Sequence, residues 1–128
     1  TIPQNNEGTE VMTLAITPTS ASSLLKIEVI LQGSISNHAQ YQIALFQDST
    51  ADALAVARVR GDAQVAVHLE NNSLMFVMVA GTTSSTTFRT RMGALSGTSY
   101  FNSAGDATSA FGGKCNSAMV ITEIETGI

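Results

Sequence analysis

The sequence predicts an all-β fold, an antiparallel sandwich or barrel with about eight strands. Three observations predict it. Apolar and polar residues alternate with a period of two, turn-forming residues separate the alternating segments, and no segment has the spacing of a long helix. The 128 residues suffice for one domain with its own core. We expect an extended lead-in over residues 1–8 and a single sandwich domain over 9–128.

The first half of the chain predicts four strands. The clearest is "LLKIEVILQG", because its alternate apolar residues share one face and its β-branched residues favour a strand. In residues 47–64, Asp48 or Ser49 would suit the N-cap of a short helix. We favour a tight turn at 48–52, because the alternation continues after it. The expected strands are 10–17, 24–33, 40–46 and 53–59.

The second half predicts four more strands. Asn71–Asn72 has the composition of a two-residue hairpin turn and would join two of them. Residues 94–114 are rich in Gly, Ser and Asn, so we expect an irregular segment there. The expected strands are 65–70, 73–81, 87–93 and 117–125.

Two of these strands are apolar on both faces: "LMFVMV" (74–79) and the start of the last strand. A sandwich strand needs only one buried face, so the other face requires a cover. We favour a second copy of the chain over a covering loop, which is the alternative. The expected interface residues are Leu74, Phe76, Met78, Met119 and Ile121.

The last strand ends in two acidic residues on the face that Met119 and Ile121 begin. Glu123 and Glu125 therefore make this face polar at its end, as expected where a strand leaves an oligomer axis. Cross-strand ion pairs of these glutamates with Arg89 and Arg91 would add roughly 0.2–1 kcal/mol each.

Composition argues against several classes of protein. Charged residues are 12% of the chain and the net charge is −4 with only six Lys and Arg, which disfavours nucleic acid as a partner. The longest apolar run, Leu74–Ala80, is too short for a membrane helix. Cys115 is the only cysteine, so we expect a buried thiol and no intrachain disulfide. The chain starts without a signal peptide or an initiator Met, which suggests processing or the end part of a longer protein.

No pattern indicates catalysis. His38 and His68 stand without the Cys or carboxylate neighbours of a zinc site, and no nucleophile elbow or phosphate-binding loop is present. Glu123 and Glu125 are close enough for a carboxylate pair, but solvated edge charges are the better interpretation. We therefore expect no enzyme, cofactor or metal. The tripeptide Arg60–Asp62 matches an integrin-type motif, and a match of this length arises readily by chance.

The irregular segment is the best candidate for ligand binding. Tyr100, Phe101 and Asn102 place two aromatic rings beside an amide, a combination that suits sugar recognition. The alternative is a packed surface loop that Phe101 and Phe111 anchor. A second, weaker candidate cluster consists of Asn37, His38 and Tyr41.

Four blocks of the sequence, in order, suggest a family: "IPQNNEGTEVMTLAITPTSASSLLKIEV", "IALFQDSTADALA", "GTTSSTTFRTRMG" and "FGGKCNSAMVITEI". Together they resemble the C-terminal β-rich domain of bacteriophage tail-fibre and related fibre proteins, over nearly the whole chain. The resemblance implies an antiparallel β-sandwich of jelly-roll (TNF/C1q-like) type. We expect a homotrimeric, non-enzymatic domain on a virion or outside cells that contacts a host surface glycan or protein. The alternative is a purely structural assembly protein, such as a capsid decoration or filament subunit, with no receptor.

Overall fold

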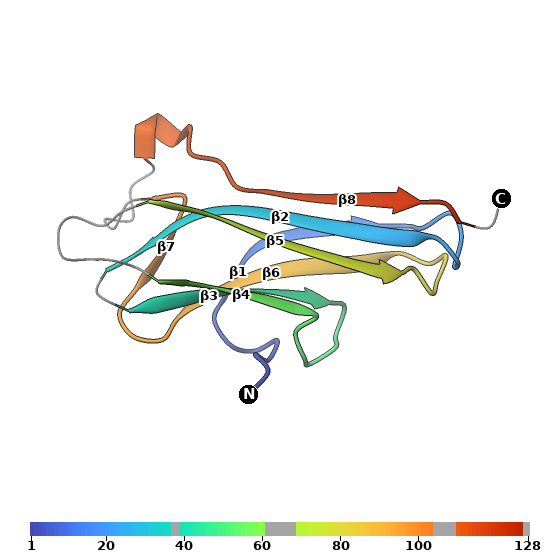
Figure 1. The fold of residues 1–128 in the computed structure, drawn as a ribbon, viewed down its shortest axis with the longest axis horizontal. Helices are drawn as coiled ribbons and strands as arrows, with labels where there is room; N and C mark the ends of the chain where they lie inside the picture. The colour runs from blue at the N-terminus through green and yellow to red at the C-terminus, as the bar shows by residue number, and fades with distance from the viewer. Residues whose placement is uncertain (37–38, 61–68, 104–109, 127–128) are drawn as a thin grey trace.

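The chain forms two antiparallel four-stranded sheets with almost no helix in this computed structural model (Figure 1). The structure describes residues 1–36, 39–60, 69–103 and 110–126. The strands are β1 (Thr9–Ile16), β2 (Leu24–Ile35), β3 (Gln40–Gln47), β4 (Ala55–Arg60), β5 (Glu70–Val79), β6 (Thr86–Ala94), β7 (Ser99–Phe101) and β8 (Ala118–Ile124), and a 3₁₀ turn, η1 (Ala110–Gly113), precedes β8. The predicted all-β class is confirmed.

The two sheets differ in their construction. One has the strand order β1–β6–β3–β4. In the other, β2 is central: β5 pairs along one edge, and β8 and β7 share the other, β8 opposite Leu24–Ile30 and β7 opposite Gly33–Ile35. β4 approaches β5 and β1 approaches β8, so the sheets also adjoin along their sides. We call them the β1–β6–β3–β4 sheet and the β2-centred sheet.

The core lies between the sheets, and the clearest predicted strand supplies much of it. Leu25, Ile27, Val29 and Leu31 of β2 are at most 1% exposed, which confirms the predicted inward face. Full burial of one such side chain stabilises the fold by about 1.5–3 kcal/mol. The facing sheet contributes the other large core side chains: Tyr41, Ile43, Leu45, Phe88 and Met92.

The favoured turn after β3 is confirmed, and the helix alternative is wrong. Asp48 takes a positive φ of 49°, which an Asp tolerates better than most residues. Its carboxylate accepts hydrogen bonds from Thr86 Oγ1 at 2.9 Å and from the Thr87 N–H at 2.8 Å. These bonds fix the turn against β6, and the chain returns as β4 in antiparallel pairing with β3.

The expected hairpin turn at Asn71–Asn72 is wrong. Both residues lie within β5, where Asn72 is opposite Leu31 and Asn71 is opposite Gln32 of β2. Pairing with β2 from Leu24 to Gly33 therefore outweighs the local turn preference of the two amides. The strand expected at 65–70 lies largely outside the described residues. Short β7 falls in the segment expected to be irregular.

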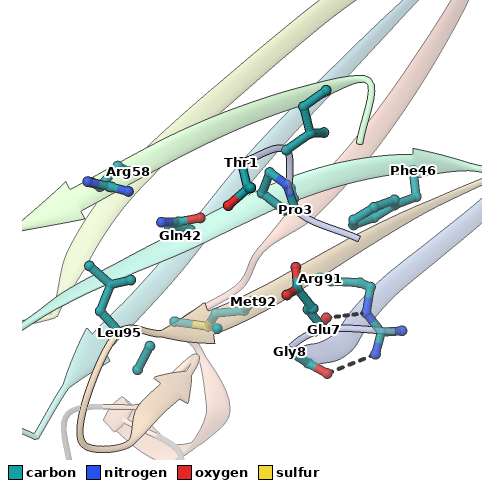
Figure 2. Close-up of a pocket in the computed structure, with 14 residues that line it drawn as sticks. Thr1, Pro3, Glu7, Gly8, Gln42, Phe46, Arg58, Arg91, Met92 and Leu95 are labelled. Atoms are coloured by element: carbon teal, nitrogen blue, oxygen red, sulfur yellow. Dashed lines mark hydrogen bonds between the residues drawn. The ribbon is translucent and has the colours of Figure 1, made fainter. Parts of the chain in front are cut away.

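The lead-in is more than an extended tail. The Asn5 N–H donates to the Ala51 carbonyl at 2.8 Å, and the Ala53 N–H donates to the Pro3 carbonyl at 3.1 Å. The lead-in thereby lies on the outer side of the β1–β6–β3–β4 sheet, where Phe46 of β3 is only 2% exposed (Figure 2). The lead-in therefore shields an aromatic ring of β3 from solvent.

Gly8 ends the lead-in in a conformation that only glycine adopts easily. Its φ is +66°, and an added Cβ would stand 2.7 Å from the Met92 carbonyl oxygen. This close approach lets the chain pass directly from the lead-in into β1 alongside β6.

The Cys115 thiol and the lengths of the helices bear on two further expectations. Cys115 is half-buried, so its thiol is less enclosed than we expected. No helix in the described part of the chain is long and apolar enough to cross a membrane.

Candidate functional site

The outer side of the β2-centred sheet is apolar. Strand alternation in β5 and β8 turns every second side chain to solvent, and these outward residues include large hydrophobic ones as well as Asn71, Ser73, Ala118 and Thr122. Met75 is 61% exposed, the highest value among them. We call this surface the apolar face, formed by Ile30, Met75, Val77, Val79, Val120 and Ile124.

One pair of opposite charges lies in the middle of the apolar face. Lys26 Nζ is 3.9 Å from Glu28 Oε1, and both residues belong to the central strand β2. Val77 and Thr122 flank Lys26 on the two neighbouring strands, and Met75 and Val120 flank Glu28. The face is therefore electrically balanced and largely apolar.

The residues expected at an oligomer interface point the other way. Their side chains lie on the inward face of β5 and β8 and pack against the buried core. The apolar surface open to a partner consists instead of their sequence neighbours. The sequence pattern could not distinguish inward from outward residues here, because both faces of these strands are apolar. The residues concerned are Leu74, Phe76, Met78, Met119 and Ile121.

Glu123 lies at the end of the inward face of β8 and does not mark an oligomer axis. Its Oε1 accepts hydrogen bonds from the Thr19 N–H at 2.8 Å, Thr19 Oγ1 at 2.9 Å and the Ser20 N–H at 3.3 Å. Desolvation acts to raise the pKa of this carboxyl, but the hydrogen bonds from Thr19 and Ser20 outweigh it and lower the pKa. Glu123 thus fixes the turn between β1 and β2.

The expected ion pairs of Arg89 and Arg91 with the last strand are wrong, because the arginines project from the opposite sheet. Arg89 Nε is 3.0 Å from Glu10 Oε1. Arg91 donates from Nε to the Glu7 carbonyl at 2.7 Å and from Nη2 to the Gly8 carbonyl at 2.8 Å. Arg89 thus forms an ion pair with β1, and Arg91 binds the backbone of the lead-in.

All four arginines of the chain lie on the outer side of the β1–β6–β3–β4 sheet. Arg89 and Arg91 project from β6, and Arg58 and Arg60 project from β4, opposite to the inward residues of those strands. We call this surface the arginine face. The sequence signal was the two-residue spacing within each pair, but only the strand order puts both pairs on one sheet.

A hollow of about 370 Å³ lies on the arginine face beside the lead-in (Figure 2). Its floor includes Ala44, and two wider hollows on the same face share residues with it. Figure 2 shows Arg58, Gln42 and Leu95 on one side of Thr1 and Pro3, and Glu7, Gly8 and Arg91 on the other.

The first predicted sugar-binding cluster is largely occupied with internal contacts. Phe101 packs against the core, while Tyr100 is half-buried. Asn102 donates its N–H to the Gln32 carbonyl at 2.8 Å, and its Oδ1 accepts from Ser117 Oγ at 2.6 Å. β7 does bring the three residues together, but Phe101 and Asn102 serve the packing of the sheet. Their role in ligand binding stays a prediction.

The one described residue of the second predicted cluster lies in the core. Tyr41 is completely buried and accepts a hydrogen bond from the Asn72 amide, so it belongs to the core. Burial, followed by the charge of Glu70, raises the pKa of Tyr41 to about 12, against the lowering effect of Asn72. Asn37 and His38 lie outside the described residues.

Phe111 does not anchor the segment before β8. Its side chain is 82% exposed, and its φ of 51° is unusual for an aromatic residue. Phe101 alone fills the anchoring role that we had considered for both rings.

Within the described ranges, no group of three or more His, Cys, Asp or Glu side chains is placed to hold a metal ion. No protein-family model matches this chain, and no curated protein matches it in sequence.

Proposed function

We propose that the protein is a non-enzymatic fibre or head domain of a virion, with a sandwich of jelly-roll type that assembles as a homotrimer and contacts a host cell-surface glycan or protein. The apolar face is the observation that carries the proposal. Side chains such as Met75 and Val79, each more than half exposed, favour a stable cover over contact with water.

A second copy of the chain is the cover that the charges favour. Lys26 and Glu28 are opposite charges side by side, so around a threefold axis the Lys26 ammonium of each copy can pair with Glu28 of the neighbouring copy. A partner with a single sign of charge would leave one of the two unpaired. Self-association therefore satisfies both the apolar residues and the central charges.

The test is a charge placed on the apolar face. We expect Val77→Asp to dissociate the oligomer at micromolar concentration, because Lys26 already pairs with Glu28 and a second carboxylate beside it would be buried in the interface without a partner of its own, which costs several kcal/mol. Val56→Asp is the matched control: Val56 is 41% and Val77 47% exposed, but Val56 lies on the opposite sheet. Sedimentation velocity gives the mass. A wild-type monomer, or an oligomer that both variants leave intact, would refute assembly through this face.

Met78→Asp would be an unsuitable variant. Met78 packs against the core, so its replacement by a charge would unfold the sandwich whatever the oligomeric state. Only a substitution at an outward position tests assembly without also disturbing the fold.

A purely structural assembly protein is the second candidate, because the same apolar face would serve it equally well. The two functions differ in receptor binding. Reproducible binding of the intact oligomer on a glycan array supports the receptor-binding domain, and the absence of binding across a broad array supports the structural assembly protein.

A further inference from the structure

We propose that the hollow on the arginine face binds the carboxylate of an acidic sugar, with Arg58 as the carboxylate-binding residue and Gln42 as a hydroxyl-binding residue. The inference rests on the receptor-contact part of the proposed function and specifies the ligand class. Its geometry is independent of the apolar face, which belongs to the other sheet.

Arg58 is available for a ligand. Its side chain is exposed and lines the hollow, and it has no ion pair or hydrogen bond with any described residue. The other two charged side chains of the hollow are engaged: Arg91 holds two carbonyls of the lead-in, and Glu7 Oε2 accepts from the Gln4 N–H at 2.8 Å. A free guanidinium offers the parallel pair of N–H donors that a carboxylate accepts.

The local charge favours an anion although the protein is acidic. The hollow has two guanidinium groups and one carboxylate among its side chains, a balance of +1, whereas the whole chain has a net charge of −4. Arg91 bonds only uncharged carbonyl oxygens, so its charge also contributes to the field at the hollow. One excess positive charge matches a singly charged carboxylate.

The rest of the hollow suits a sugar ring. Gln42 lies directly opposite Arg58 in the β3–β4 pairing, which puts the two Cβ atoms about 5 Å apart. Its amide carries both donors and an acceptor for hydroxyl groups, and no described residue occupies them. Leu95, 60% exposed, offers an apolar contact for ring C–H groups. The volume of about 370 Å³ is at the lower end of ligand sites.

The experiment compares an acidic sugar with its neutral counterpart. Trigalacturonate and galactotriose are titrated into the full chain by calorimetry, alongside an array of uronic- and sialic-acid glycans with matched neutral glycans. We expect acidic glycans to bind and neutral ones to bind at least about tenfold more weakly, because hydrogen bonds between a guanidinium and a carboxylate are stronger than those between neutral groups. Acetate should compete poorly, since it lacks the hydroxyl contacts.

Arg58→Gln should weaken binding of the acidic glycan about tenfold or more. Arg60→Gln is the matched control: Arg60 projects from the same face of the same strand but does not line the hollow. Both positions are exposed, so both variants should melt like the wild type. Equal binding by Arg58→Gln and the wild type, equal binding of the neutral counterparts, or no binding by any acidic glycan would overturn the inference.

Sedimentation of the same samples separates this inference from the proposed function. A monomer whose binding of acidic glycans depends on Arg58 would support the site and refute the assembly. An oligomer that binds only neutral glycans would support receptor contact and overturn the acidic-sugar site.

Discussion

Alkaline pH should destabilise the protein through Tyr41. This side chain is fully buried, and the pKa of its hydroxyl is raised to about 12, first by burial and then by the charge of Glu70. The unfolded chain has an ordinary tyrosine pKa of 10.0 at this position. Between these two values the unfolded state releases the proton while the folded state keeps it. Stability is therefore fully present below pH 10 and falls as the pH rises toward 12.

The size of the effect follows from the two pKa values. A difference of about two units corresponds to about 2.7 kcal/mol when the titration is complete, because each unit is 1.36 kcal/mol. The part lost between pH 9 and pH 11 is about 1.3 kcal/mol. At pH 8, Tyr41→Phe should be less stable than the wild type by about 0.5–1.5 kcal/mol, because Asn72 loses its hydrogen-bond acceptor. The gap should narrow or reverse by pH 11.

Urea unfolding at pH 8, 9, 10 and 11 measures the effect as the difference between wild type and Tyr41→Phe. The subtraction removes the contribution of every other group that titrates in this range. Tyr100→Phe is the control, since it keeps Tyr41 and should keep the alkaline loss. Parallel loss of stability in wild type and Tyr41→Phe from pH 9 to 11 would refute the reasoning.

Two further predictions concern a buried hydroxyl and a carboxylate. Thr90 Oγ1 is buried without a hydrogen-bond partner among the described residues, so Thr90→Val should raise the unfolding free energy by about 1 kcal/mol, and a lower melting temperature would contradict this. The lowered pKa of Glu123 contributes stability above its unfolded value of 4.5, which is lost as the pH falls through the folded value. Glu123→Gln should therefore differ from wild type in urea unfolding at pH 7 and converge with it toward pH 3. Exposed Glu125→Gln is the control, and a pH-independent Glu123 gap would contradict the assignment.

Strand alternation predicted the core of the central strand correctly because β2 carries apolar residues on one face and charges on the other. Its inward side chains, from Leu25 to Leu31, are buried as expected. The same alternation is ambiguous in β5, where both faces are apolar. Met78 turned out to face the core and Val77 the solvent, a choice that depends on which side of β5 meets the second sheet.

The candidate ligand site was outside the reach of local patterns. Arg58 and Gln42 are neighbours only through the pairing of β3 and β4, and the lead-in that borders their hollow is distant in sequence from both. The aromatic residues around Phe101 led to the prediction of a sugar-binding cluster there. Hydrophobic rings near a sheet more often serve its packing, as Phe101 does here.

The amino-acid sequence by itself determined the all-β class, most of the strand positions, the turn after β3 and the excess of apolar strand surface. These properties depend on period-two alternation and on turn residues, which act over a few neighbours along the chain. Only the tertiary structure decided which apolar side chains remain outside, that the lead-in covers Phe46, and that all four arginines share one face. Those properties depend on strand order and on contacts between distant segments. Local sequence does not determine them, because the neighbours of a side chain on a surface are set by the tertiary fold.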